Sequence, residues 1–96
     1  MSPDNKKKLN IIRVKLDRLD NKLLSIIKYR SSLVKEVLKL KEFKKEIVDQ
    51  KRINFILSKI KGKSKKLKID PKITNRIWKN MIWSYIDFER RNFKKK

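Results

Sequence analysis

An arginine interrupts an otherwise apolar stripe in the first part of this chain. The stripe, here called the apolar seam, steps by fours and threes through Ile12, Leu16, Leu19, Leu23, Ile26, Leu33, Val37 and Leu40. This spacing is typical of a helix that packs against another helix, and the step after Ile26 falls on Arg30. A guanidinium there is costly to desolvate unless an anion meets it, and no carboxylate lies three or four residues away. We therefore expect a ligand or another helix to supply negative charge to Arg30.

Other charged residues break apolar patterns in the same way. Lys41 lies eleven residues after Arg30, which is three helical turns and about 16 Å along one face. Arg52 falls among apolar residues of a second helical pattern, and Glu89 follows Tyr85 by four on the apolar side of a third. These charges could contact a ligand. Alternatively, Lys41 is solvated, or Glu89 forms an ion pair with Arg30, Lys41 or Arg52.

Arg13 and Asp49 need separate interpretations. Arg13 precedes Arg30 by seventeen residues, about 25 Å along the axis and about 100° around the helix. One chain therefore cannot direct both arginines at one small ligand, although an antiparallel dimer could. Asp49 has a simpler explanation, because a carboxylate in a first helical turn compensates the helix dipole.

Composition restricts the possible chemistry. The 96 residues include no Cys and no His, which excludes disulfides, thiolate catalysis and the commonest general base and zinc ligand. A chain this short buries only about 60 to 65% of its unfolded surface as a monomer, so self-association is expected. No apolar run reaches the ~18 residues of a membrane span, and the N-terminus lacks the apolar core of a signal peptide. We expect a cytoplasmic protein without a membrane partner, metal or cofactor.

The net charge of +20 has two interpretations. Such a charge attracts nucleic acids, anionic membranes and small acidic metabolites. However, the chain has no Ala and is rich in Lys, Ile and Asn, whose codons are rich in A and T. Drift of the gene toward A and T would therefore explain much of the positive charge.

Periodicity predicts an all-α, three-helix chain forming one domain over residues 1–96, with frayed ends at 1–5 and 94–96. The first helix is expected from about Lys6 to about Phe43, after a Ser2-Pro3-Asp4 start, and spans more than ~50 Å. The second resumes after the polar stretch Glu42–Glu46 and continues to about Ile60 or Lys63, with Gly62 as a plausible terminator. The third begins with Asp70 as N-cap and Pro71 in the first turn, and continues to about Phe93.

The charged residues, in this order, resemble the small all-helical chorismate mutases and the related isochorismate-pyruvate lyases. The resemblance covers roughly residues 9–93 and rests on these elements: Ile12-Arg13, Leu19-Asp20, Leu23-Leu24, Arg30, Val37, Lys41, Asp49-x-x-Arg52, Ile69-Asp70-Pro71 and Met81-Ile82 through Glu89. It implies an intertwined homodimer in which the long first helices pair antiparallel. Each of the two sites would be completed by an arginine from the partner.

The resemblance also implies roles for the charged residues. Arg30 and the partner's Arg13 would clamp the two carboxylates of chorismate, and Lys41 would donate to its ether oxygen. Arg52 would contact a carboxylate or the enolpyruvyl group, Asp49 would lie near the ring hydroxyl, and Tyr85 and Glu89 would line the site. The rearrangement to prephenate, a step of the shikimate pathway to aromatic amino acids, is pericyclic and needs no nucleophile, metal or general base.

Two positions depart from the family pattern. Many bacterial members have Gln where this chain has Glu89, which can donate to an ether oxygen only when protonated. Ile53 stands where many mutases have a Glu that binds the ring hydroxyl, and with Tyr85 it resembles the lyases. We expect a mutase first and a lyase second.

Two other classes remain as alternatives. A nucleic-acid-binding module would use the Lys6–Lys8, Lys63–Lys68 and Lys94–Lys96 clusters with Trp78, Trp83 and Phe93 for stacking. The spread of basic residues over every segment disfavours this reading. A purely structural protein would be favoured if the inward cations pair internally with Glu89.

Overall fold

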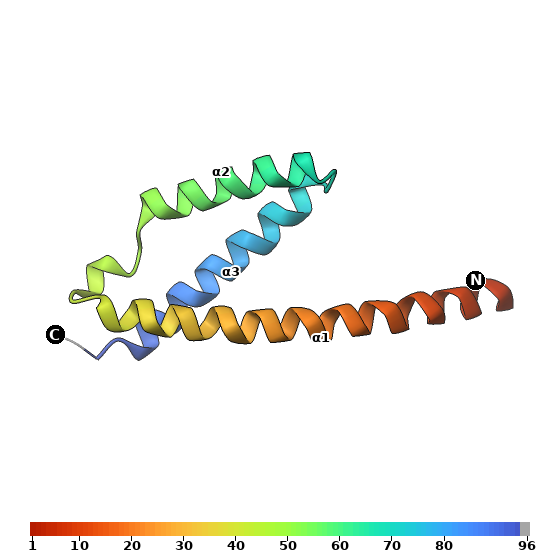
Figure 1. The fold of residues 1–96 in the computed structure, drawn as a ribbon, viewed down its shortest axis with the longest axis horizontal. Helices are drawn as coiled ribbons and strands as arrows, with labels where there is room; N and C mark the ends of the chain where they lie inside the picture. Colours follow the sequence, from red (N-terminus) through yellow and green to blue (C-terminus); the bar gives the residue numbers. More distant parts are fainter. Residues whose placement is uncertain (95–96) are drawn as a thin grey trace. The chain divides into compact units, whose positions relative to one another are not determined.

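The computed structural model describes residues 1–94 and is all-helical (Figure 1). Its elements are α1 (Pro3–Leu40), a short 3-10 helix (Lys44–Glu46), α2 (Gln50–Lys66) and α3 (Pro71–Asn92). The predicted all-α class, the three helices and the long first helix are confirmed. Residues 95 and 96, part of the tail expected to fray, lie outside the described residues.

Contacts divide the chain into two compact units, Met1–Leu33 and Val34–Lys96. The first contains most of α1, and the second contains the last turns of α1 and all of α2 and α3. A single domain over residues 1–96 stays a prediction. No helix within residues 1–94 is long and apolar enough to cross a membrane.

The start of α1 follows from its first residues. The Ser2 hydroxyl oxygen accepts a hydrogen bond from the Asn5 backbone N–H at 3.2 Å, and Pro3 occupies the first helical position, where its missing N–H costs nothing. The helix therefore begins at Pro3, three residues before the expected Lys6.

The end of α1 differs from the expected Phe43, because the helix stops at Leu40. The Lys41 N–H bonds to the Leu38 carbonyl at 3.2 Å, as in a tighter 3-10 turn. The Glu42 N–H then bonds to the Glu46 carboxylate at 3.1 Å. The Glu46 side chain, four residues later in the chain, thus accepts from the Glu42 N–H in place of the backbone carbonyl that a continuing helix would have supplied.

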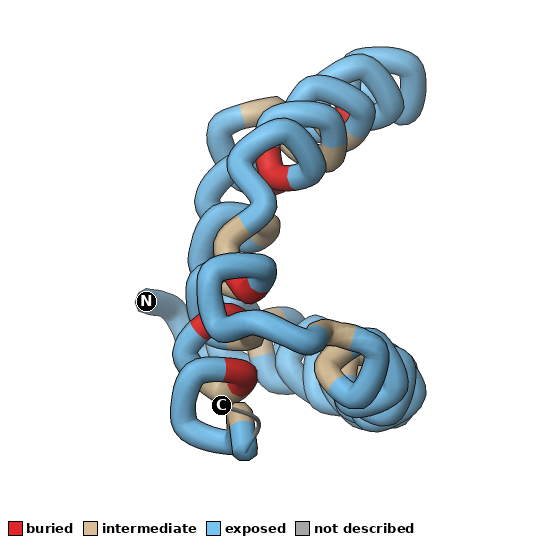
Figure 2. Tube along the Cα trace, turned by 90° about the vertical axis from the view of Figure 1, so that its left-hand side faces the viewer, coloured by how far each residue is buried: buried red, intermediate tan, exposed pale blue. Residues whose placement is uncertain are grey.

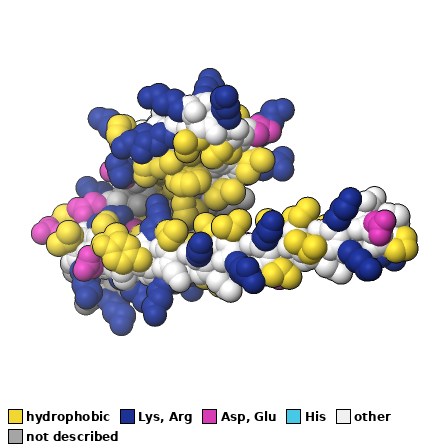
Figure 3. All heavy atoms as spheres, turned by 45° about the vertical axis from the view of Figure 1, so that its right-hand side comes forward, with side chains coloured by type: hydrophobic (Ala, Val, Ile, Leu, Met, Phe, Trp, Pro, Cys, Tyr) yellow, Lys and Arg dark blue, Asp and Glu magenta, His cyan; other side chains and the backbone are white. Residues whose placement is uncertain are grey.

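No residue of α1 is buried. The residues of the apolar seam are all exposed, from 42% at Leu33 to 81% at Leu40. The turns of α1 that can be seen in Figure 2 are mostly exposed, and Figure 3 shows apolar side chains interspersed with Lys and Arg on α1. The long helix therefore presents a substantial uncovered apolar face in the isolated chain.

The core lies in the second unit, between α2 and α3. Its buried apolar residues are Ile47, Ile53, Ile82 and Ile86, and Val48, Ile56, Leu57 and Phe93 pack against them. The two helices form a hairpin through the turn at residues 67–70 (Figure 1). As predicted, Asp70 caps α3 by accepting from the Lys72 N–H at 2.9 Å, and Pro71 occupies the first turn.

A pair of buried hydroxyls links the end of α2 to the start of α3. The Ser64 and Thr74 side-chain oxygens lie 2.7 Å apart. Ser64 donates its single proton to the Ile60 carbonyl at 2.6 Å, so Thr74 is the donor between the two hydroxyls, and the Pro71 carbonyl lies 3.3 Å from the Thr74 oxygen. Burial of these polar groups is tolerated because every one of them is hydrogen-bonded.

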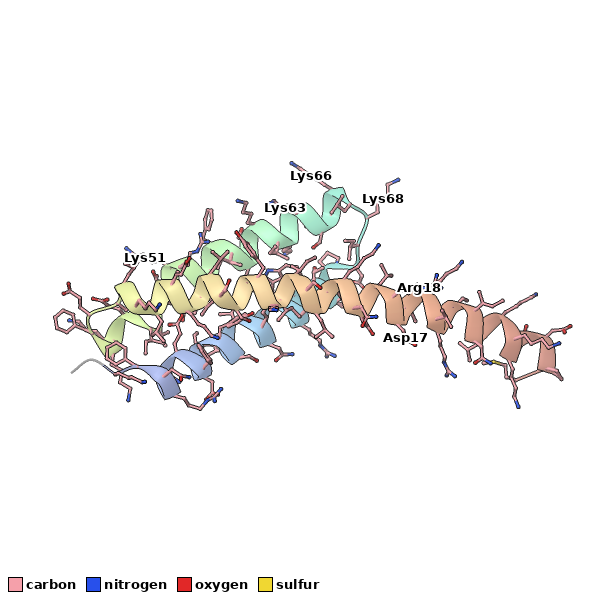
Figure 4. All side chains as sticks on the ribbon, turned by 60° about the horizontal axis from the view of Figure 1, so that its bottom comes forward. Asp17, Arg18, Lys51, Lys63, Lys66 and Lys68 are labelled. Carbon is pink, nitrogen blue, oxygen red and sulfur yellow. The ribbon has the colours of Figure 1, made fainter. Side chains whose placement is uncertain are left out.

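The prediction that Gly62 ends the second helix is wrong, because α2 continues to Lys66. The helix ends in a Schellman motif, in which the Ile69 N–H bonds to the Ser64 carbonyl at 2.9 Å and the Lys68 N–H to the Lys65 carbonyl at 3.1 Å. Lys68, which projects from this turn in Figure 4, has φ of 57°. The cost of a helical glycine, about 1 kcal/mol, does not outweigh the packing that the last turn gains around Ser64.

This helix end predicts two stabilising substitutions. Lys68→Gly should relieve left-handed strain, and Gly62→Ala should restrict the unfolded chain without a clash, since a Cβ at residue 62 would meet nothing within 4 Å. Each should raise the free energy of unfolding by about 0.5–1 kcal/mol. Urea denaturation at a fixed protein concentration measures both. Lys61→Gly, an exposed position inside the helix, is the control and should destabilise; a loss of stability in Lys68→Gly would contradict the proposed cause.

Candidate functional site

A partly buried ion pair joins Lys41, the residue after α1, to Glu89 near the end of α3. The Lys41 ammonium nitrogen lies 2.7 Å from a carboxylate oxygen of Glu89, with side chains 18% and 8% exposed. Lys41 also donates to the Ile47 carbonyl at 3.5 Å. At this separation and burial, each charge compensates the desolvation of the other.

Local structure explains how the pair forms. Glu89 follows Ile86 by three residues and Ile82 by seven, so it lies on the same face of α3 as the core. Lys41 directly follows the last residue of α1, where the chain turns toward the core residue Ile47. Glu89 was expected to face inward, and for Lys41 the sequence left open a solvated side chain, a ligand contact or an ion pair with Glu89; the structure has the ion pair.

Asp49 and Arg52 lie in the first turn of α2. Asp49 is the N-cap, and its carboxylate accepts from the Arg52 backbone N–H at 3.0 Å. This agrees with the simple interpretation of Asp49 as a residue of the helix start. The cap uses one carboxylate oxygen of Asp49 and does not use the other. The Arg52 guanidinium lies 5.4 Å from the centre of the Phe55 ring, and the Lys59 ammonium lies 5.7 Å from that centre.

Phe55 was missed by the sequence analysis. It is 55% exposed and lies three residues after Arg52 and four before Lys59. Those spacings place all three on one side of a helix, and a cation beside an exposed aromatic ring is a favourable pair. The i, i+3 spacing of an arginine and a phenylalanine could have predicted the contact.

Tyr85 and Ile53 belong to the α2–α3 hairpin. Tyr85 is half-buried, one helical turn before Glu89. Ile53 is only 7% exposed and is part of the core. The departure from the family pattern at residue 53 therefore has a structural use, because its side chain packs against other isoleucines.

Arg13 and Arg30 lie in the first unit, on one unbroken helix. Arg13 is exposed and Arg30 is half-buried. Seventeen helical residues separate them, which corresponds to about 25 Å. Because α1 is continuous between Arg13 and Arg30, one chain cannot direct both side chains at one small ligand. A second chain would have to supply one of them.

The described residues 1–94 contain no group of three or more His, Cys, Asp or Glu side chains arranged to hold a metal ion. Of the predicted site residues in the second unit, Lys41 and Glu89 are brought together as an ammonium and a carboxylate, and Asp49 caps the start of α2. Such groups can donate and accept hydrogen bonds and stabilise charge on a bound molecule.

Comparisons with known proteins bear on this arrangement. A family model described as chorismate mutase type II matches residues 12–90. The chorismate mutase of Methanocaldococcus jannaschii is 36% identical over 76 residues, which cover 78% of this chain and 77% of that protein. No solved structure matches. The matched range includes Arg13, Arg30, Lys41, Arg52 and Glu89.

Proposed function

Since the chain belongs to the type II chorismate mutase family and is therefore an isomerase, we propose that it rearranges chorismate to prephenate at a site containing Lys41 and Glu89. The observation that carries the proposal is the family match over residues 12–90, which includes Lys41 and Glu89. The two side chains lie 2.7 Å apart; the purely structural alternative also expected such a pair, so the family match decides between the two. An ammonium donor held in place by a carboxylate suits a reaction whose developing charge lies on one ether oxygen.

In this proposal, Lys41 donates to the ether oxygen as the carbon–oxygen bond breaks and the new carbon–carbon bond forms. The electrons move within the substrate, so the protein supplies no nucleophile and accepts no proton. Arg30 and the partner's Arg13 bind the two carboxylates and hold the compact conformer. Binding therefore restricts the substrate, and Lys41 stabilises the charge that develops.

Arg52, Asp49 and Tyr85 complete the proposed site. Arg52 would leave its position over the Phe55 ring to meet a substrate carboxylate or the enolpyruvyl group; a solvent-exposed cation–π contact of about 0.5–1 kcal/mol is weak enough to exchange. Asp49 would approach the ring hydroxyl with the carboxylate oxygen that its cap does not use. Tyr85 would form part of the wall beside Glu89.

We further propose that the protein is an antiparallel homodimer. The apolar seam is uncovered along α1, and an exposed apolar face of this length is typical of an interface. A second copy lying antiparallel would cover it and would bring the partner's Arg13 toward Arg30. The small core of the second unit, in which only four apolar residues are buried within residues 1–94, also favours assembly.

The second candidate is an isochorismate-pyruvate lyase on the same fold. The observation that favours it is Ile53, which lies in the core and offers no polar group to a ring hydroxyl. Because both reactions pass through a cyclic transition state, one cationic site can serve either. The choice between them then depends on the substrate that the site orients productively.

Turnover by the purified protein distinguishes the two candidates. Chorismate and isochorismate are supplied separately, and the products are identified by mass spectrometry. Efficient formation of prephenate from chorismate supports the proposal. Salicylate and pyruvate from isochorismate, with only slow prephenate formation, would make the protein a lyase, and no turnover of either would refute both.

A further inference from the structure

A groove unrelated to any proposed substrate contact lies between the last turns of α1 and the end of α3. It measures about 350 Å³, which is within the range of small-ligand sites. Leu38, Phe88 and Phe93 supply its apolar surface, and Lys35, Lys39 and Lys94 also line it. All of these residues belong to the second unit.

Helix geometry explains why these side chains converge. Lys35, Leu38 and Lys39 are spaced i, i+3 and i+4, so they share one face of α1. Phe88 and Asn92 are likewise one turn apart on α3, and the Asn92 amide donates to the Phe88 carbonyl at 2.8 Å. The chain leaves the helix at Phe93, whose backbone is extended, so that Phe93 and Lys94 form the remaining wall.

The groove combines apolar and cationic character. Leu38, Phe88 and Phe93 are each half-buried, and a ligand ring could pack against the two aromatic side chains in offset geometry. None of the residues that line the groove is acidic. The α3 dipole opposes an anion at this helix end with about half a charge, which is less than the charge of Lys35 and Lys94 together.

We propose that this groove binds a small aromatic carboxylate, with its ring against Phe88 and Phe93 and its carboxylate between Lys35 and Lys94. An uncharged ring would leave Lys35 and Lys94 without an anionic ligand, and a simple inorganic anion would leave the apolar surface uncovered. The site is separate from the Lys41–Glu89 pair, and its existence does not depend on the proposed reaction.

Titration with 3-phenylpropanoate tests the proposal, with amide and aromatic chemical shifts followed by NMR. Saturable shifts at Leu38, Phe88 and Phe93 are expected, with a dissociation constant on the order of 1 mM for a ligand of this size. The uncharged 3-phenylpropanamide should bind about fivefold more weakly or worse. Equal binding of the amide, or the absence of saturation, would overturn the proposal.

Matched variants locate the binding. Lys35→Gln with Lys94→Gln should weaken 3-phenylpropanoate binding about fivefold, whereas Lys15→Gln with Lys22→Gln removes the same charge from the first unit and should not. Arg30→Ala should also leave binding unchanged, which separates this groove from the proposed active site. If all three variants bind equally well, or if only Arg30→Ala loses binding, the groove is not the site.

Discussion

Replacing Arg30 by alanine is expected to lower kcat/KM for chorismate by about 10³-fold, because Arg30 is the proposed bidentate partner of a substrate carboxylate. Arg30→Lys should recover little of the loss, since an ammonium cannot reproduce the planar two-point contact. Steady-state kinetics with both variants measure the effect. Helix content, followed by circular dichroism, should remain unchanged.

Arg18 provides the matched control. It is an exposed arginine on α1 (Figure 4), and Arg18→Ala removes the same charge from the same helix. Its kcat/KM should stay within about twofold of the unchanged protein, as expected for a surface site. Equal losses in Arg18→Ala and Arg30→Ala would mean that overall charge, and not a specific contact, drives substrate binding.

The second large effect concerns the ion pair. Lys41→Met leaves the Glu89 carboxylate, of which 8% is exposed, without its cationic partner. A buried charge without a partner costs about 3–5 kcal/mol, so the free energy of unfolding should fall by about 3 kcal/mol. Mutase activity should also be lost, because Lys41 is the proposed donor to the ether oxygen. Urea denaturation at fixed protein concentration measures the first effect, and chorismate turnover the second.

A double-mutant cycle separates stability from catalysis. In a Glu89→Gln background, Lys41→Met removes no charge partner and should cost much less stability than it does alone. Activity should nevertheless remain low in the double variant, since the donor is still missing. Equal stability losses in both backgrounds would show that the two residues are not energetically coupled.

The helix starts were predictable because their chemistry is local. Asp70 and Pro71 were identified as the start of the third helix and occupy those positions, and the Ser2-Pro3-Asp4 start is likewise a cap. Helix ends depended on more distant groups. The Glu46 side chain shapes the end of α1, and the Schellman motif at Lys68 is not signalled by a glycine, so Gly62 was mistaken for the terminator.

The inward charges could be predicted in part. Glu89 interrupts the apolar face of α3, which identified it as buried, but its partner depends on how the end of α1 packs against α3. No sequence pattern distinguishes Lys41 from the other cations considered. Ser64 and Thr74 were missed for a related reason: small hydroxyl residues do not change an apolar pattern, and only the packed hairpin shows that they meet.

The arrangement of the two arginines is tested most directly by mixing inactive chains. Arg13→Ala and Arg30→Ala subunits are unfolded together and refolded, and mass spectrometry verifies that mixed dimers have formed. If each site takes Arg30 from one chain and Arg13 from the other, a mixed dimer contains one site with both arginines. About a quarter of the unchanged activity should then return for random pairing.

A chain carrying both substitutions is the control, because its mixed dimers with the unchanged chain have no intact site and should add no activity. The account predicts recovery of chorismate mutase activity in the first mixture and none from the mixed dimers of the second. Mixed dimers of Arg13→Ala and Arg30→Ala that form but remain inactive would contradict a site shared between two chains.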